Sequence, residues 1–597
     1  MCSTATSPSS THVAIDIEEN NKQEDNDDRV KLGIGNTTKA LPSLREVPLV
    51  ELSLNSITYA PLTRSSGGTN TSKLKQKRTT VLSNVTTSIA PSTLSAWMGP
   101  SGCGKTSLVS VAAGLIDSND LVEDSSILIN KEKGTLPKRM VGVVWQDDLL
   151  LSNLTVKETV RFAARLKNPR EVSDKEVEIL VDNTLSKLGL THVQDSLIGM
   201  PGGSGKSRGV SGGERKRVAV AVELVARPSI LILDEPTSGL DASTAHQLMV
   251  TLKSLAELGH SIAVVIHQPR TSIFNMFDNL LLLSKGKVVY EGEPSGARQF
   301  LESCPDVGAL PAETGLADWI MDVINDDEKK DGNLPSLWKE HYIKQQQQDI
   351  PQCRSGNQLT QRHIANRRSL KFSQMQRRLS SLKELEEGEP KFQSSFWVQL
   401  KLLIRRALKQ QRGQRLTSVA AIVTFAWTLF TCLAWGRLPD NTTYVYSRAS
   451  LLFFVLIAQA NGVVNSSVMI FSSERHLLSR ERAKKLYGVL PYFTAMTLSD
   501  MINSVILPTV YGCVVYWVCN LRPTASAFFT YLLTFYFTIS AAQSMGLFLS
   551  VLIPNSKIAL LLAPMLCLSL FILGGFYMPL DLIPPSLEWY SWISMAR

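Results

Sequence analysis

The chain has 597 residues, and at roughly 150 residues per domain this length allows several domains with cores of their own. The formal net charge of +9 is spread over polar segments and the flanks of apolar stretches, without one basic stripe interleaved with aromatic residues, so no nucleic-acid partner is expected. Eight cysteines without CxxC spacing indicate neither a zinc site nor a disulfide framework.

Residues 1–48 are polar and carry no apolar periodicity. Such a segment cannot bury enough apolar surface to offset the entropy cost of ordering, so we expect a disordered N-terminal tail. The first 30 residues also lack the apolar run of a signal peptide. Any entry into a membrane must therefore come from internal segments.

Residues 49–302 alternate short apolar runs with helix-like stretches, a pattern typical of a largely parallel α/β domain. Near its start, GPSGCGKT at 99–106 matches the phosphate-binding pattern G-x-x-x-x-G-K-[ST] between an apolar run and a helix-like stretch. Backbone N–H groups of such a loop surround phosphates, while Lys105 reaches the β and γ oxygens and Thr106 binds Mg²⁺. The predicted ATP contacts here are Gly99, Ser101, Gly102, Cys103, Gly104, Lys105, Thr106 and Ser107.

A second GKS triplet at 205–207 is not expected to bind phosphate, because Met200 stands where the leading glycine is required and no strand precedes it. Cys103 is expected to be a small filler inside the true loop, since no neighbour marks it as a nucleophile.

Four polar residues follow other apolar runs of this domain. Gln146, after VGVVW, is a candidate sensor of the metal or the γ-phosphate. Asp234 and Glu235 end the run ILILDE, where the first can hold Mg²⁺ through water and the second can polarise the attacking water. His267 ends SIAVVIH. A lone histidine there is more often structural, but together with the other motifs it is a catalytic candidate.

The stretch VSGGERKR at 210–217 precedes a helix-like run. Gly212 and Gly213 therefore predict a second helix N-terminus suited to a phosphate, which one nucleotide in one loop does not require. For the three cations that follow, the alternative is an ordinary solvated helix face. That alternative leaves Ser211 and the two glycines unexplained.

Residues 303–392 predict a polar linker, within which RRLS at 377–380 matches a basophilic kinase site. Residues 393–415 predict an amphipathic connecting helix. Its apolar side carries Phe396, Trp397, Leu400, Leu403, Ile404 and Leu408, and its other side carries Lys401, Arg405 and Lys409. Such a helix suits the headgroup plane of a membrane, and packing against the α/β domain is an equal alternative.

Residues 416–597 predict an all-α transmembrane domain. Five apolar segments are each long enough for a ~30 Å hydrocarbon core, near 416–435, 449–471, 497–519, 526–552 and 558–578. The protein is therefore expected to be a multi-pass integral protein of the plasma membrane or an organelle membrane.

The loops between these segments predict their orientation. The segment SSERHLLSRERAKKLYG after the second span is rich in Arg and Lys, whereas the loop before that span has only Arg437 and Arg448. By the positive-inside rule, the basic segment is cytoplasmic, together with the α/β domain. Asn441, in Asn-Thr-Thr, then faces outside and is a candidate glycosylation site.

Within the spans, Asn461 and Asn465 are polar residues in an apolar environment. They are candidates for a substrate path, together with Phe453 and Phe454. Hydrogen bonding between helices is an equally good explanation for the two asparagines.

The loop at 99–106, Gln146, VSGGE, ILILDEP, Ser238-Gly-Leu-Asp241 and His267 occur in the order and spacing of ATP-binding cassette proteins, which the chain resembles over about residues 50–300. The order of cassette before membrane domain, with IHQPRTSIF and GGERKR, resembles the white or G subfamily of half-transporters. In that family six spans are expected, so the visible five imply an incomplete membrane domain.

The resemblance implies further roles. Ser211, Gly212 and Gly213 would bind the γ-phosphate held by the partner of a head-to-tail dimer, with Asp241 nearby. Tyr59 would lie near the adenine. Phe576 and Tyr577 occupy the position at which some members close an outer cavity.

The resulting hypothesis is a dimeric half-transporter that hydrolyses ATP with Mg²⁺ and exports lipid-like or amphipathic molecules. The second half-transporter could be identical or different. The alternative is a truncated ATP-binding regulatory or dominant-negative subunit paired with a full-length partner. A soluble cassette protein of translation or repair is a third class, which the apolar spans argue against.

Overall fold

A computed structural model describes residues 47–63, 77–122, 124–134, 137–170, 172–200, 209–305, 307–330, 332–348, 392–411 and 418–574, with isolated positions up to Trp592. Almost all of the predicted tail, the RRLS motif and the GKS triplet at 205–207 lie outside these residues, as does the linker between residues 349 and 391.

The first domain is built on a six-stranded sheet of order β12-β11-β5-β10-β9-β8. All neighbours in it are parallel except β11 and β12. Its strands are β5 (Leu94–Met98), β8 (Val141–Val144), β9 (Ile230–Asp234), β10 (Ser261–Val265), β11 (Asn279–Ser284) and β12 (Lys287–Gly292). The carboxyl ends of the parallel strands meet at one edge, where the loop at 99–106, Gln146, Asp234, Glu235 and His267 follow or end β5, β8, β9 and β10, whereas VSGGE lies at the start of a helix.

An antiparallel sheet of order β4-β1-β6-β7 lies beside it in the same domain. Its strands are β1 (Leu52–Tyr59), β4 (Leu82–Ile89), β6 (Ser126–Ile129) and β7 (Glu132–Lys133), and a separate hairpin pairs β2 (Leu62–Thr63) with β3 (Lys77–Arg78).

The helices of this domain are α1 (Lys105–Ala112), α2 (Val156–Lys167), α3 (Asp174–Lys187), α4 (Gly212–Leu224), α5 (Ala242–Glu257), α6 (Thr271–Phe274), α7 (Pro294–Ser303), α8 (Leu316–Lys329) and α9 (Leu334–Gln348), with 3₁₀ turns η1 (Ser118–Asp120), η2 (Lys138–Met140) and η3 (Thr191–Val193). Helices α2, α3 and α4 each begin with a capping box, in which the side chain of an N-cap Ser or Thr and that of the Glu three residues later bond each other's backbone N–H.

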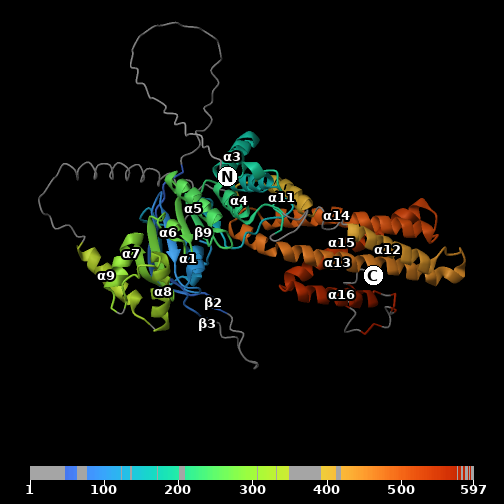
Figure 1. The fold of residues 1–597 in the computed structure, drawn as a ribbon. Coiled ribbons are helices and arrows are strands. Elements are labelled where there is room, and N and C mark those ends of the chain that lie inside the picture. Colours follow the sequence, from blue (N-terminus) through green and yellow to red (C-terminus); the bar gives the residue numbers. More distant parts are fainter. Residues whose placement is uncertain are drawn as a thin grey trace, which may run out of the picture. The chain divides into compact units, whose positions relative to one another are not determined.

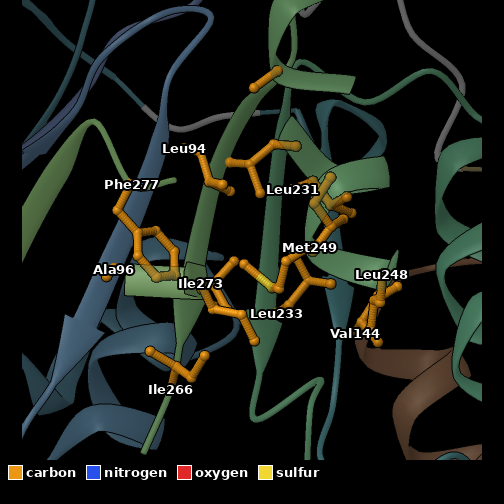
Figure 2. Close-up of a cluster of buried hydrophobic side chains, with 14 of the residues drawn as sticks. Leu94, Ala96, Val144, Leu231, Leu233, Leu248, Met249, Ile266, Ile273 and Phe277 are labelled. Carbon is orange, nitrogen blue, oxygen red and sulfur yellow. The ribbon is translucent and has the colours of Figure 1, made fainter. Parts of the chain in front are cut away.

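The main core of the domain lies between the large sheet and the helices that cover it (Figure 1). Figure 2 shows Leu231 and Leu233 of β9 and Leu94 of β5 directed toward Met249 of α5. Strands β9 and β10 are buried along their whole length, as expected for strands covered on both faces.

This core continues past residue 302, where the sequence predicted a polar linker to begin. Helices α8 and α9 lie in that segment, and their Trp319, Ile320 and Trp338 are buried in the main cluster. Trp338 packs against Tyr290 of β12 and Phe300 of α7. In α8, Asp318, Asp322 and Asp326 are exposed on the opposite side, so an amphipathic helix accounts for part of the polar composition.

The membrane domain consists of long apolar helices preceded by α11. Their bounds are α11 (Phe396–Gln411), α12 (Ser418–Trp435), α13 (Val445–Ala483), α14 (Val489–Val518), α15 (Ala525–Leu552) and α16 (Ser556–Ile572), with a 3₁₀ turn η5 (Thr442–Tyr444). Among the described residues, four segments are long and apolar enough to cross a membrane, from α12 to α15. The fifth predicted span is the shorter apolar helix α16.

Helix α13 is longer than the predicted second span. It has 39 residues and continues through the basic segment that the sequence placed in a loop, as far as Ala483. The chain turns only at Lys484–Gly488, before α14. The charged residues extend the helix beyond the apolar window, and Arg480 and Lys484 near its end contact the first domain.

Helices α13 and α15 run side by side in the centre of the membrane domain (Figure 1). At Gly546 of α15, an added Cβ atom would lie 2.7 Å from the carbonyl oxygen of Val464 and 2.9 Å from Cβ of Ser467. This glycine therefore permits a close helix crossing. Helix α12 packs on α14 and leaves side chains such as Val419, Phe425 and Leu433 exposed, as expected for a span that faces lipid.

Candidate nucleotide-binding site

The phosphate-binding loop joins β5 to α1. Gly104 is the N-cap of α1 and has a left-handed φ of 103°, and an added Cβ atom there would lie 2.7 Å from the Leu82 side chain. Only glycine fits this position without strain. The Lys105 ammonium is buried and donates hydrogen bonds of 2.8 Å to the carbonyl oxygens of Gly99 and Pro100, so it lies inside the curve of the loop.

Thr106 and Asp234 meet at the carboxyl ends of β5 and β9. The Thr106 hydroxyl donates to Asp234 Oδ2 at 3.0 Å. Burial raises the pKa of the Asp234 carboxyl, although the hydrogen bond from Thr106 opposes the shift. Hydroxyl and carboxylate oxygens are ligands that Mg²⁺ prefers, so this pair fits the predicted metal site.

Glu235 lies between two of the predicted residues. Gln146 Nε2 donates to one carboxylate oxygen at 2.7 Å, and His267 Nε2 lies 2.9 Å from the other. The three side chains come from the ends of β8, β9 and β10, so the sheet order brings together residues that are far apart in the sequence.

The backbone at Glu235 is unusual. Its φ is +48°, in the left-handed region that residues other than glycine seldom adopt. Its N–H still donates to the carbonyl oxygen of Val265 at 3.0 Å, so the neighbouring strand holds the residue in this conformation. Strained backbone that the fold enforces is typical of functional positions.

The segment VSGGE forms the start of α4. Ser211 is the N-cap, and its hydroxyl donates to Glu214 Oε2 at 2.8 Å while its N–H bonds the same carboxylate. Burial alone would raise the pKa of Glu214, but the hydrogen bonds from Ser211 and His192 hold it below its usual value. An added Cβ atom at Gly213 would lie 2.1 Å from the Thr244 side chain, so α4 and α5 meet closely at this point.

The cations of ERKR do not form a solvated face. Lys216 is 3% exposed, and its ammonium donates to Asp148 Oδ1 and to the carbonyl oxygen of Gln146, each at 3.0 Å. Arg215 donates to the carbonyl oxygens of Gly199 and Asp148. Both side chains hold the segment 145–148, which carries Gln146.

Three other predicted ATP contacts have structural roles of their own. Asp241 is the N-cap of α5 and accepts a hydrogen bond from Thr244 N at 3.0 Å. Tyr59 ends β1, packs on the second core cluster, and burial raises the pKa of its phenol. Cys103 is 3% exposed, and burial raises the pKa of its thiol, which fits the predicted role of filler.

Helix α4 connects this site to the membrane domain. Glu223 in its last turn is buried, with one carboxylate oxygen 3.0 Å from Lys167 Nζ of α2 and the other 2.7 Å from Lys484 Nζ, which follows α13. Burial alone would raise the pKa of Glu223, but the two ammonium groups hold it at about 2. Burial lowers the pKa of Lys167 to about 8, although Glu223 opposes the shift.

The end of α13 also contacts the segment that follows β8. Arg480 donates to the carbonyl oxygen of Asp147 at 2.7 Å, and its guanidinium lies 5.5 Å from the centre of the Trp145 ring. Lys484 donates to the carbonyl oxygen of Val143 at 3.0 Å. The segment that carries Gln146 is thus held by α4 from one side and by α13 from the other.

Comparison with known proteins covers both domains. The family model described as ABC transporter matches residues 82–238, and the model described as ABC-2 type transporter matches residues 398–597. The "Broad substrate specificity ATP-binding cassette transporter ABCG2" of Mus musculus is 32% identical over 608 residues, which cover 99% of this chain and 87% of that protein.

A plant relative gives the same result. The "ABC transporter G family member 21" of Arabidopsis thaliana is 30% identical over 546 residues, which cover 87% of this chain and 76% of that protein.

The chain belongs to the G family of ATP-binding cassette transporters. It is a multi-pass membrane protein in which ATP hydrolysis is coupled to transport. The predicted fold class, an α/β cassette followed by a helical membrane domain, is confirmed.

The candidate path residues of this transporter fall into two groups. Phe453 of α13 stacks on Phe576 at 4.3 Å between ring centres and meets Tyr577 at 5.1 Å. Phe454 instead contacts Trp427 and Trp435 of α12. The structure therefore brings Phe453, Phe576 and Tyr577 together and separates Phe454 from them.

Asn461 and Asn465 lie on α13, on the C-terminal side of Phe453. The Asn461 amide nitrogen donates to the carbonyl oxygen of Ile457 at 3.3 Å. Within the described part of the chain, the side-chain oxygens of both asparagines are buried without a hydrogen-bond partner. Asn441 is exposed between α12 and α13.

Sequence reasoning missed Glu223 and Trp145, which contact the membrane domain, and the buried cassette cations Lys167 and Lys216 beside them. Lys167, Glu223 and Lys216 stand in helix-like stretches where charged residues are common, and Trp145 belongs to an apolar run. One signal was available: a glutamate among apolar residues in VAVAVELVA is uncommon unless it has a buried partner.

Proposed function

We propose that the chain works as one half of a dimeric transporter that exports lipid-like or amphipathic molecules. The observation that carries the proposal is the ion pair between Lys484 and Glu223. It connects α4, which begins with the signature segment Ser211–Gly213, to the helices that cross the membrane. The proposed partner is a second half-transporter, either an identical chain or a relative.

The composite ATP site follows from the separation of two phosphate-binding segments. In the described part of the chain, Lys105 bonds carbonyl groups of its own loop and Thr106 bonds Asp234, whereas the Ser211 hydroxyl bonds Glu214 of its own helix. Two helix N-termini that could each receive a phosphate are thus available in one chain. A head-to-tail dimer uses both, with the loop at 99–106 of one chain opposite Ser211–Gly213 of the other.

Within that site, Glu235 is the proposed general base. Its carboxylate can accept a proton from water at a position that Gln146 and His267 define, because both side chains are within hydrogen-bond distance of it. Lys105 would neutralise phosphate charge, and Thr106 and Asp234 would hold Mg²⁺. When bound, Mg²⁺ would stabilise the charge that develops on the phosphate oxygens.

Closure of the dimer would reach the membrane through α4. A ligand shifts a conformational equilibrium only if it binds one state better, and ATP contacted by both chains binds the closed state better. Movement of Ser211 toward the partner carries Glu223 with it, because both belong to the same helix. Glu223 then pulls Lys484 and the turn between α13 and α14.

The proposed substrate path runs along α13. The stacked aromatic residues Phe453, Phe576 and Tyr577 offer apolar contact area, and the unpartnered oxygens of Asn461 and Asn465 offer acceptors. A mostly apolar surface with a few polar groups suits an amphipathic molecule.

The composite site can be tested by mixing two defective chains, Lys105→Met and Gly213→Glu. Each variant alone has two damaged sites per dimer. In a mixed dimer of head-to-tail geometry, one site combines an intact phosphate loop with an intact signature segment. Trapping of labelled nucleotide by vanadate should therefore return only in co-expressed pairs.

If each chain instead closed its own site, the mixed dimer would have no intact site and trapping would stay absent. Co-purification of the two chains through different affinity tags confirms that mixed dimers are present. The matched control is one chain that carries both Lys105→Met and Gly213→Glu, co-expressed with wild type. A head-to-tail dimer of these two chains has no intact site, so any trapping must come from wild-type chains that pair with each other.

A further inference from the structure

Helix α11 presents a row of three cations at every fourth position, Lys401, Arg405 and Lys409. Residues four apart lie on the same face of a helix, so the three charges follow one line. The opposite face, with Leu403, Arg406 and Ala407, is buried against α14 and α2. The predicted apolar side of this helix is therefore divided, because Leu403 is buried whereas Trp397 is 74% exposed.

A hollow of about 550 Å³ lies on one side of the row, between α11 and α2. Its lining includes six cations and only two carboxylates. Four of the cations have partners: Arg161 with Glu178, Arg165 with Asp174, Lys409 with Glu158 and Arg406 with Glu481. Within the described part of the chain, Lys401 and Arg405 have no ion pair, and both are exposed.

A second hollow, of about 740 Å³, lies on the other side of the same row. Apart from the three cations, it is lined by Trp397, Leu400, Ile404 and Leu408. The row thus separates a cationic hollow from an apolar one. An exposed apolar surface of this kind next to positive charge is unusual for a helix that faces only water.

The position of α11 in the chain indicates the source of a ligand. Gln411 ends this helix and Ser418 begins the first membrane-crossing helix, so α11 is tied to the membrane surface. Anionic headgroups attract Lys and Arg at this depth, while Trp and aliphatic side chains contact acyl chains. A free phosphate would use only the cationic hollow and leave the apolar one unexplained.

We propose that Lys401 and Arg405 bind the phosphate headgroup of an anionic phospholipid, whose acyl chain lies against Trp397, Leu400, Ile404 and Leu408. Lys401 and Arg405 are the two cations of the described lining without an ion pair, and a strongly anionic headgroup gains the most from both. This site is separate from both the ATP site and the proposed substrate path, so it stands or falls independently of the proposed function.

The test uses the full chain purified in a neutral detergent and a dioctanoyl phosphatidylinositol bisphosphate with a fluorophore on one acyl chain. Binding is measured by fluorescence anisotropy. Loss of both cations in Lys401→Gln/Arg405→Gln should weaken binding of the anionic probe about tenfold. Trp397→Ala should also weaken it.

Two variants serve as controls. Lys339→Gln/Lys344→Gln removes the same charge from α9, which packs on β12 at the sheet edge opposite β8, and should bind the lipid like wild type. Lys401→Arg/Arg405→Lys keeps the charge and should also bind it. Unchanged ATP binding shows that the variants are folded.

Competition separates lipid from soluble phosphate. Unlabelled dioctanoyl phosphatidylinositol bisphosphate should displace the probe, whereas inositol trisphosphate without acyl chains should need at least about ten times the concentration. Equal competition by the free headgroup would overturn the proposal, as would wild-type affinity in Lys401→Gln/Arg405→Gln or an equal loss in the α9 variant.

Discussion

The Glu235 carboxylate has one polar partner on each of its oxygens, Gln146 and His267, and its backbone is held in a left-handed conformation. This arrangement fixes the orientation of the carboxylate more tightly than a free side chain would allow. A general base must lie within hydrogen-bond reach of the water it activates. The position of Glu235 therefore depends on three strands. Removal of its carboxylate charge should affect ATP hydrolysis more than folding.

Glu235→Gln is expected to lower ATP hydrolysis by about 10²-fold or more, because general-base catalysis contributes factors of about 10² to 10⁴. ATP binding should persist, since Lys105 and the loop at 99–106 are unchanged. Phosphate release and nucleotide binding are measured on the same preparation. Glu257→Gln, at the exposed end of α5, is the matched control and should hydrolyse ATP like wild type.

Lys216→Met is expected to destabilise the cassette, because the Asp148 carboxylate, whose side chain is only 12% exposed, loses the ammonium group 3.0 Å away. Breaking a buried pair costs about 3–5 kcal/mol. Since about 1 kcal/mol shifts the midpoint by roughly 2–4 °C for a domain of this size, thermal unfolding should begin several degrees earlier. The double variant Lys216→Met/Asp148→Asn should recover part of the loss. A midpoint equal to wild type in the single variant would show that the cation is not needed there.

At the scale of elements, α4 and α13 meet at one carboxylate. Glu223 accepts from a cation of the cassette and from a cation of the membrane domain, and both contacts are buried. Buried ion pairs are costly to desolvate, so their value lies in fixing one arrangement rather than in added stability. Helix α4 therefore has a defined contact at each end, the signature segment and Lys484.

A double-mutant cycle tests this contact. Glu223→Gln and Lys484→Met should each lower the thermal midpoint of the full chain and reduce vanadate-sensitive ATP hydrolysis in lipid, and the double variant should lose less than the sum of the two. The expected interaction free energy is about 1–3 kcal/mol. Additive losses would mean that the two side chains do not act through each other. Lys485→Met, at the next position, provides the charge-matched control.

Gly546→Ala tests the crossing of α13 and α15. An added methyl group would meet the Val464 carbonyl and Ser467 Cβ, so the helices must separate and the thermal midpoint should fall. Gly462→Ala on α13 adds the same atom where no described atom lies within 4 Å, and should change the midpoint little. Equal effects of the two substitutions would contradict this helix packing.

Much of this arrangement was predictable from local patterns. Strand–loop–helix order placed Lys105 and Thr106, and apolar runs placed Asp234 and His267 at strand ends. The full length of α13 was not predicted, because the basic segment from Arg475 to Arg482 was assigned to a loop, and the partners of its residues, such as Asp147 and Arg406, are distant in the sequence. Lys216 was not predictable for the same reason: its burial depends on Asp148, which is distant in the sequence.

At the scale of the whole molecule, packed residues connect the candidate ATP site to the helices that cross the membrane. The Gln146 segment contacts Glu235, the proposed general base, as well as α4 through Lys216 and α13 through Arg480. Each connection joins parts of the chain that are distant in the sequence, from 70 residues for Lys216 on Gln146 to 333 residues for Arg480 on Asp147. We therefore expect ATP hydrolysis to lose its coupling to transport when the contacts of Glu223 and Asp147 with the membrane domain are broken, even with every predicted ATP-binding residue intact.

The most direct measurement is vanadate-sensitive ATP hydrolysis by the full chain in lipid nanodiscs, beside Glu235→Gln, with the particle mass determined in parallel. Hydrolysis by particles with the mass of a dimer, which is lost in Glu235→Gln, is the predicted result. A folded chain that binds ATP without hydrolysing it, or hydrolysis by particles with the mass of a single chain, would contradict the proposed dimeric transporter.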